Sequence, residues 1–198
     1  TGARHRFIRT KELSDGRYAE NPPDRCFYCK DELYSRLFEI AREEGLPAVV
    51  DGQNADDASD YRPGSEAARR HAVRSPLKEA GLSKAEVREI ARAREIPIWD
   101  KPASPCLASR FPYGTRITAE SLDRVDTAEI FVRSLGFRDV RVRARSGSAT
   151  VEVEPGSVAR LLEPVLASRV VDRLLDDSQS LRPKILRRHR NDHVVGGD

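Results

Sequence analysis

Three cysteines are the residues of this sequence with the clearest chemical potential. Cys26 and Cys29 form a C-x-x-C motif in "NPPDRCFYCK", and Cys106 lies far along the chain in "SPCLASR". A disulfide would leave one thiol over, and a structural zinc site takes four ligands. Three thiolates suit a [4Fe–4S] cluster with one exchangeable iron. The spacing leaves three interpretations open: this cluster, a zinc site that borrows His71, and three reduced thiols without a metal.

A second group of candidate residues lies in the acidic loop "DGQNADDASDYRPG". This loop follows "PAVVDG", which is predicted to be a short buried strand. Ligands bind at the carboxyl ends of the strands in open α/β sheets, and carboxylate oxygens suit Mg²⁺. The loop carries four carboxylates, Asp51, Asp56, Asp57 and Asp60, and the candidates for binding a nucleotide with its Mg²⁺ are Gly52, Asn54, Asp57 and Asp60. A helix cap or a solvated loop would account for one or two of the carboxylates.

Arg141 and Arg143 form a third candidate group, in the predicted strand "RVRAR". Residues two apart on a strand point to the same face, and two guanidinium groups can form a fork for a phosphate or a carboxylate. The alternative is that both belong to the solvent-facing side of a hairpin.

The elements that must position these residues change character along the chain. Strands and helices alternate in the first hundred residues, which favours an α/β fold with a parallel sheet. The rest predicts a small α+β domain with a hairpin in "DVRVRARSGSATVEVE". Helices are expected from Asp31 to Gly45, after the Ser83 cap with Glu86, and from Thr118 to Gly136.

Composition narrows the classes of protein. Hydrophobic residues make up 38% and charged residues 34% of the 198-residue chain. No apolar run approaches the roughly 18 residues that a membrane span needs, and no signal peptide is recognisable. We therefore expect a cytoplasmic protein with reduced thiols and no membrane partner. Its basic segments lack interleaved aromatic residues, so a nucleic-acid partner is not expected. The chain contains no Met, which indicates a processed N-terminus or a fragment.

Several motifs together resemble the LarE family of ATP-dependent sulfur transferases, in the PP-loop (N-type ATP pyrophosphatase) superfamily. They are "NPPDRCFYCK", "DGQNADDASDYRPG", "SPLKEAGLSKAEVREIA", "WDKPASPCLASRFPYGTRIT" and "GFRDVRVR". The resemblance implies a Rossmann-like parallel sheet of the adenine nucleotide alpha hydrolase type. It places a partial PP-loop domain at 1–105 and an α+β domain for substrate binding or oligomerisation, with a polar tail, at 106–198.

The activity that the resemblance implies belongs to synthesis of the nickel-pincer nucleotide, the cofactor of lactate racemase. ATP adenylylates a carboxylate of pyridinium-3,5-biscarboxylic acid mononucleotide, and a sulfur nucleophile then displaces AMP to give a thiocarboxylate. Some members of the family sacrifice the cysteine of the "CLASR" motif. Other members have an additional C-x-x-C motif, as this chain does. The similarity to these members implies that this chain holds a [4Fe–4S] cluster that carries a sulfide.

The resemblance also assigns residues to these steps. The cluster ligands would be Cys26, Cys29 and Cys106. Glu129, Arg141 and Arg143 match positions that surround the reacting substrate and its phosphate, and together with Cys106 they form the expected catalytic set.

The sequence departs from the family pattern at its start. The family's "SGGxDS" loop, whose backbone N–H groups cradle pyrophosphate, is absent. The expectation is that a segment is missing ahead of Thr1 and that the chain as printed binds ATP weakly and is inactive. Two alternatives stay open: a tRNA-thiolating PP-loop enzyme and a catalytically inactive metal-binding fragment. The expected partners are the small mononucleotide substrate and further copies of the chain.

Overall fold

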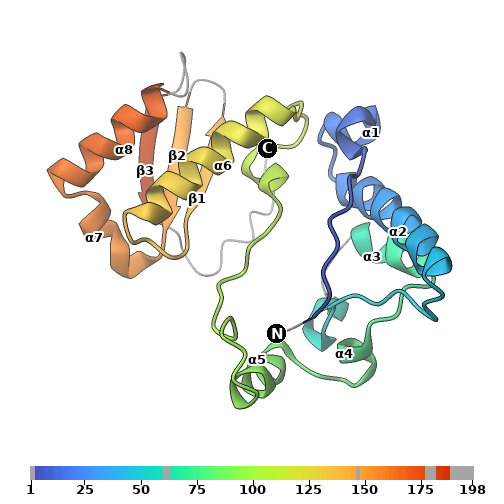
Figure 1. Cartoon of the computed structure of the whole chain (residues 1–198). Helices are drawn as coiled ribbons and strands as arrows, with labels where there is room; N and C mark the ends of the chain where they lie inside the picture. Colours follow the sequence, from blue (N-terminus) through green and yellow to red (C-terminus); the bar gives the residue numbers. More distant parts are fainter. Residues whose placement is uncertain (1–2, 60–62, 146–147, 177–181, 188–198) are drawn as a thin grey trace. The chain divides into compact units, whose positions relative to one another are not determined.

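The structure is a computed structural model that describes residues 3–59, 63–145, 148–176 and 182–187 (Figure 1). The chain divides into two compact units, Thr1–Lys101 and Pro102–Asp198. Within the described ranges, no helix is long and apolar enough to cross a membrane.

Unit 1 is built mainly from helices. Its elements are η1 (Glu12–Ser14), α1 (Gly16–Ala19), α2 (Arg25–Glu43), η2 (Ala55–Ser59), α3 (Pro63–Arg70), α4 (Pro76–Glu79) and α5 (Lys84–Ala93). Helices α2 and α3 pack against each other (Figure 1). Ala67 and Ala68 of α3 are both buried against Tyr34 and Ala41 of α2, and these small side chains allow the two helices to approach closely.

The helix predicted from Asp31 begins earlier than expected, at Arg25. The C-x-x-C motif, which precedes the predicted helix start at Asp31, therefore belongs to the first turns of α2. Asp24 occupies the N-cap position, and Pro22 and Pro23 precede it. A proline disfavours a helical conformation of the residue before it, so these prolines keep the helix from extending further toward the N-terminus. The predicted end is confirmed, because Gly45 follows α2 with a φ of +66°.

The prediction of a parallel sheet in unit 1 is wrong for the residues that the structure describes. In the described part of the unit, extended segments pair only in one isolated parallel bridge, between Val50 and Arg74. Residues 4–9 form no strand, and Phe7 is 90% exposed. A strand needs a partner for its backbone N–H and C=O groups, and the described residues of unit 1 supply one for only this bridge. The described residues thus contain no Rossmann-like sheet.

Unit 2 combines helices with a three-stranded sheet. Its elements are η3 (Leu107–Arg110), α6 (Ala119–Ser134), β1 (Arg141–Arg145), β2 (Ser148–Val153), η4 (Pro155–Ser157), α7 (Val158–Leu161), α8 (Pro164–Asp176) and β3 (Arg182–Arg187). The strand order is β1-β2-β3. Strands β1 and β2 form the predicted antiparallel hairpin, with Arg143 opposite Thr150, and β3 pairs parallel to β2.

One face of this sheet forms the core of unit 2. Val142 of β1 and Val151 of β2 pack with Val132 of α6 and Val170 of α8 in one cluster of buried residues. Helices α6 and α8 therefore cover the same face of the sheet (Figure 1). This leaves the other face of β1, which carries Arg141 and Arg143, to meet the segment that precedes α6.

The predicted helix caps are confirmed in both units. Ser83 and Glu86 form a reciprocal capping box at the start of α5. Thr118 forms another with Ser121 at the start of α6. Helix α6 ends as predicted before Gly136, whose φ of +88° favours glycine.

Candidate functional site

Cys106 occupies an exposed position at the N-cap of η3. The turn that follows is closed by the Ser109 backbone N–H, which donates to the Cys106 carbonyl at 2.9 Å. Ala108, within this turn, is fully buried. The cysteine is thus accessible, while the backbone after it is held in a short helical turn.

Arg110 anchors this turn from below. Its side chain is only 2% exposed, and it forms a bidentate ion pair with Glu129 of α6, with Nε–Oε1 at 2.5 Å and Nη2–Oε2 at 3.1 Å. Its remaining nitrogen, Nη1, donates to the Pro105 carbonyl at 3.3 Å and to Ser109 Oγ at 2.9 Å. Arg110 therefore ties the residues on both sides of Cys106 to α6.

Glu129 is completely buried. Besides Arg110, it accepts hydrogen bonds from Arg133 at 2.5 Å and from the Val142 backbone N–H at 3.0 Å. Burial alone would raise the pKa of Glu129, but the hydrogen bonds from Arg110, Val142 and Arg133 outweigh it and hold the pKa below its usual value. The carboxylate is therefore ionised at neutral pH and anchors Arg110. Its catalytic role stays a prediction.

Arg143 approaches the same turn from β1. Its Nη1 donates to the Ser109 carbonyl at 3.1 Å, and its Nε forms an ion pair with Glu152 Oε1 at 2.5 Å. Arg141 lies two residues away on the same face, opposite Glu152 in the strand register. The structure thus brings Arg143 and Glu129 to the segment that begins at Cys106.

The sequence interpretation missed the anchoring residues Arg110, Ser109 and Glu152. One available signal was Glu129 itself, because it lies on the same stripe of α6 as the buried Val125 and Val132. A carboxylate on a buried stripe requires a cationic partner. The sequence does not say which arginine provides it, because Arg110 lies 19 residues away in a separate element.

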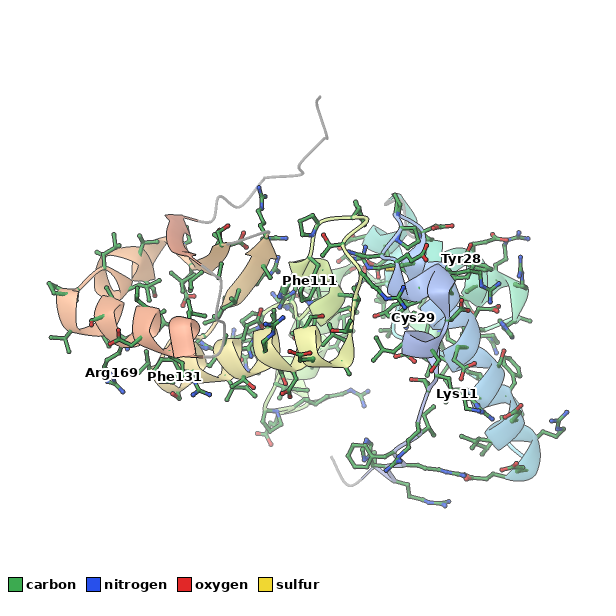
Figure 2. All side chains as sticks on the ribbon, turned by 90° about the horizontal axis from the view of Figure 1, so that it is seen from above. Lys11, Tyr28, Cys29, Phe111, Phe131 and Arg169 are labelled. Atoms are coloured by element: carbon green, nitrogen blue, oxygen red, sulfur yellow. The ribbon has the colours of Figure 1, made fainter. Side chains whose placement is uncertain are left out.

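The two thiols of unit 1 lie on the first turns of α2. Cys26 is exposed and Cys29 is half-buried, and Figure 2 labels Cys29 beside Tyr28. The guanidinium of Arg17 lies over the Tyr28 ring, 4.8 Å from its centroid. The guanidinium of Arg70, from α3, lies 4.7 Å from the centroid of the Phe27 ring. The residues between the two cysteines are therefore held in place by cation–π contacts.

The chemistry of these donors fits an iron–sulfur cluster, since none of the three cysteines is in a disulfide and all have some exposure. Cys26 and Cys29 belong to unit 1, and Cys106 belongs to unit 2. Among the described side chains, no group of three or more His, Cys, Asp or Glu is arranged to hold a metal ion. His71, the candidate fourth zinc ligand, has its Nε2 2.9 Å from an Asp31 oxygen.

Asp51 organises the start of the acidic loop. It accepts hydrogen bonds from Tyr34 Oη at 3.2 Å, Ser75 Oγ at 2.7 Å, and the Gln53 backbone and side chain at 3.1 and 2.7 Å. Burial opposes ionisation, but these bonds prevail and lower the pKa of Asp51. Burial and the neighbouring Asp51 charge raise the pKa of Tyr34 to about 12. Asp51 therefore joins α2 to the loop as an ionised carboxylate.

The residues predicted to bind a nucleotide follow directly. Asp57 Oδ2 accepts from the Asn54 backbone N–H at 3.0 Å, and Asn54 Oδ1 accepts from the Asp56 backbone N–H at 3.0 Å. Gly52 is exposed beside them, and Asp60 lies outside the described residues. Asn54 and Asp57 thus lie together at the start of η2, and nucleotide binding by this group stays a prediction.

Comparison with known proteins finds relatives of the chain, among them one whose name states an activity. No family model matches the chain. Over 150 residues the chain is 41% identical to the pyridinium-3,5-bisthiocarboxylic acid mononucleotide synthase of Lactiplantibacillus plantarum. This match covers 76% of the chain and 54% of the synthase. The chain is homologous to this synthase.

Two uncharacterised proteins are also similar. Protein slr1717 of Synechocystis is 45% identical over 86% of the chain and 63% of its own length. Protein MJ0830 of Methanocaldococcus jannaschii is 30% identical over 74% of the chain and 58% of its own length. The chain thus spans between about half and two thirds of the curated relatives that it matches.

Proposed function

We propose that the protein takes part in ATP-dependent sulfur transfer to pyridinium-3,5-biscarboxylic acid mononucleotide, in the synthesis of the nickel-pincer nucleotide. The observation that carries this proposal is the homology to the Lactiplantibacillus plantarum synthase, whose name states the bisthiocarboxylic acid product. The accessible Cys106, held on a turn fixed by two arginines, supports it independently.

The proposed reaction has two steps. A carboxylate oxygen of the substrate attacks the α-phosphorus of ATP, pyrophosphate leaves, and an acyl adenylate forms. A sulfur nucleophile then attacks the acyl carbon, and the bond from that carbon to the AMP oxygen breaks. AMP leaves with the electron pair, and the product is a thiocarboxylate.

The chain's own residues would serve these steps in two groups. Arg141 and Arg143 would bind the phosphate of the mononucleotide, since both lie on one face of β1 and Arg143 reaches the Cys106 turn. Binding of ATP and Mg²⁺ falls to the acidic-loop residues Gly52, Asn54, Asp57 and Asp60.

Cys26, Cys29 and Cys106 would hold a [4Fe–4S] cluster. When bound, this group supplies an exchangeable iron to which a sulfide can attach. Cys106 is then retained from one turnover to the next, whereas in the sacrificial route Cys106 itself loses its sulfur.

Anaerobic iron and sulfide analysis after reconstitution tests this assignment. We expect about four iron atoms per chain, and their loss in the variants Cys26→Ser and Cys106→Ser. His71→Ala is the matched control: it leaves a three-thiol cluster intact but would remove a ligand from a zinc site. Full iron loading in Cys26→Ser would contradict this set of ligands, and absence of iron from the native chain would favour a sacrificed Cys106.

A further inference from the structure

Arg110 divides its hydrogen bonds between two different parts of unit 2. Nε and Nη2 bind Glu129 of α6, while Nη1 binds the Pro105 carbonyl and Ser109 Oγ. Pro105 immediately precedes Cys106, and Ser109 follows it by three residues. The guanidinium therefore holds the Cys106 turn from both sides.

The contacts of Arg110 do more than balance the charge of Glu129. Glu129 also binds Arg133, whose side chain is 37% exposed. Burying a guanidinium costs desolvation free energy. A surface arginine such as Arg133 can therefore balance the charge of Glu129 at a lower free-energy cost than a buried one. What Arg110 adds to Glu129 is the link to Pro105 and Ser109.

The chemistry of arginine suits this link. A planar guanidinium can bind a carboxylate with two nitrogens and still direct the third elsewhere. A lysine ammonium presents a single charged nitrogen and does not reproduce this fixed geometry. Arg143 adds a second contact, to the Ser109 carbonyl, from a different element.

We propose that Arg110 is a positioning residue that fixes the backbone carrying Cys106 for the sulfur chemistry. The proposal deepens the function proposed above and rests on it for its catalytic consequence. Its structural content stands on the contacts of Arg110 alone. The side chain acts through the turn and does not itself touch the reacting atoms.

Hydrogen exchange of the full chain, followed by mass spectrometry over residues 106–111, tests the positioning. The Ser109 and Phe111 amides donate to the carbonyls of Cys106 and Ala108, so both report on the turn. In Arg110→Met we expect their exchange to accelerate at least about tenfold, because two bonds from a charged donor are lost.

Arg133→Met is the matched control, because it also removes an arginine from Glu129. Arg133 donates to Glu129 and to the Val140 carbonyl, and neither acceptor belongs to the turn. We expect exchange over 106–111 to stay unchanged in this variant. Equal acceleration in Arg133→Met would overturn the proposal, since loss of any Glu129 partner would then suffice.

A double variant, Arg110→Met with Glu129→Gln, keeps the test decisive if Arg110→Met alone fails to fold. It removes both buried charges, so the folding defect is relieved, while the link to Pro105 and Ser109 stays broken. We expect fast exchange over 106–111 in a folded chain. Native-like exchange in this variant would refute the positioning role.

A kinetic measurement tests the catalytic consequence. In a single-turnover assay with substrate adenylate, Arg110→Lys keeps a positive charge beside the native Glu129 but not the guanidinium geometry, and it should lose at least about tenfold in rate with substrate affinity unchanged. An unchanged rate would refute the consequence. If the native chain transfers no sulfur, the proposed function fails, whereas the exchange result still decides whether Arg110 positions the turn.

Discussion

Replacing Glu129 by Gln should be one of the most destabilising single changes in unit 2. The native carboxylate is fully buried and binds Arg110, Arg133 and the Val142 amide. The amide of Gln is of similar size, so no cavity forms, but Arg110 keeps its charge without a counter-charge. Removing one partner of a buried ion pair costs about 3–5 kcal/mol, out of a total stability of roughly 5–15 kcal/mol for a domain.

The same carboxylate should make stability depend on pH. The pKa of Glu129 is lowered from its ordinary value of 4.5, because the bonds from Arg110, Val142 and Arg133 outweigh burial. The folded state therefore binds this proton less readily than the unfolded state. The stabilisation is fully present above pH 4.5 and is lost as the pH falls through the folded pKa. Glu129→Gln should lack this contribution.

Urea denaturation followed by circular dichroism, between pH 3 and 7, measures both effects. Hydrogen exchange at the Val142 amide, which donates to Glu129, assigns the loss to unit 2. The matched control is Arg69→Gln, which breaks an exposed pair with Glu66 and should leave the midpoint nearly unchanged. A Glu129→Gln midpoint no lower than that of this control would show that the buried pair contributes nothing to stability.

Three further predictions follow from other parts of the chain. Gly136→Ala should cost about 1–3 kcal/mol in thermal melts, because Gly136 has a φ of +88° and a Cβ there would lie 2.9 Å from Arg160 Nη2; an unchanged melting temperature would contradict this. Tyr34→Phe should cost about 1 kcal/mol through the lost bond to Asp51 and remove a tyrosine that ionises at about pH 12 in an absorbance titration; an unaltered titration curve would show the assignment to be wrong. Arg141→Ala should weaken binding of the mononucleotide, measured by calorimetry, while iron loading stays intact; native affinity would remove Arg141 from the site.

Local sequence signals predicted the capped helices and the hairpin well. The Ser83 and Thr118 boxes and the terminal Gly136 act within one helical turn, so nearby residue types determine them. The alternation of β1 and β2 likewise depends on neighbours along one strand. These features could be predicted because their causes are local.

Long-range features could not be predicted in the same way. The predicted parallel sheet of unit 1 needs strands that pair across the fold, and the described residues provide one bridge, at Val50 and Arg74. The start of α2 at Arg25 could not be predicted because "DRCFYCKD" presents no apolar stripe with helical spacing. The Arg110–Glu129 pair joins two elements, and their contact exists only once unit 2 has folded.

The most direct test of the proposed chemistry is a single-turnover incubation of the reconstituted chain with the adenylate of pyridinium-3,5-biscarboxylic acid mononucleotide, analysed by mass spectrometry. Supplying the adenylate tests sulfur transfer independently of ATP binding. We expect a product in which sulfur replaces one carboxylate oxygen, with Cys106 intact in the recovered protein, and no such product from Cys106→Ser. A product formed equally well by Cys106→Ser would contradict the role proposed for Cys106, and no product from the native chain would contradict the proposed function.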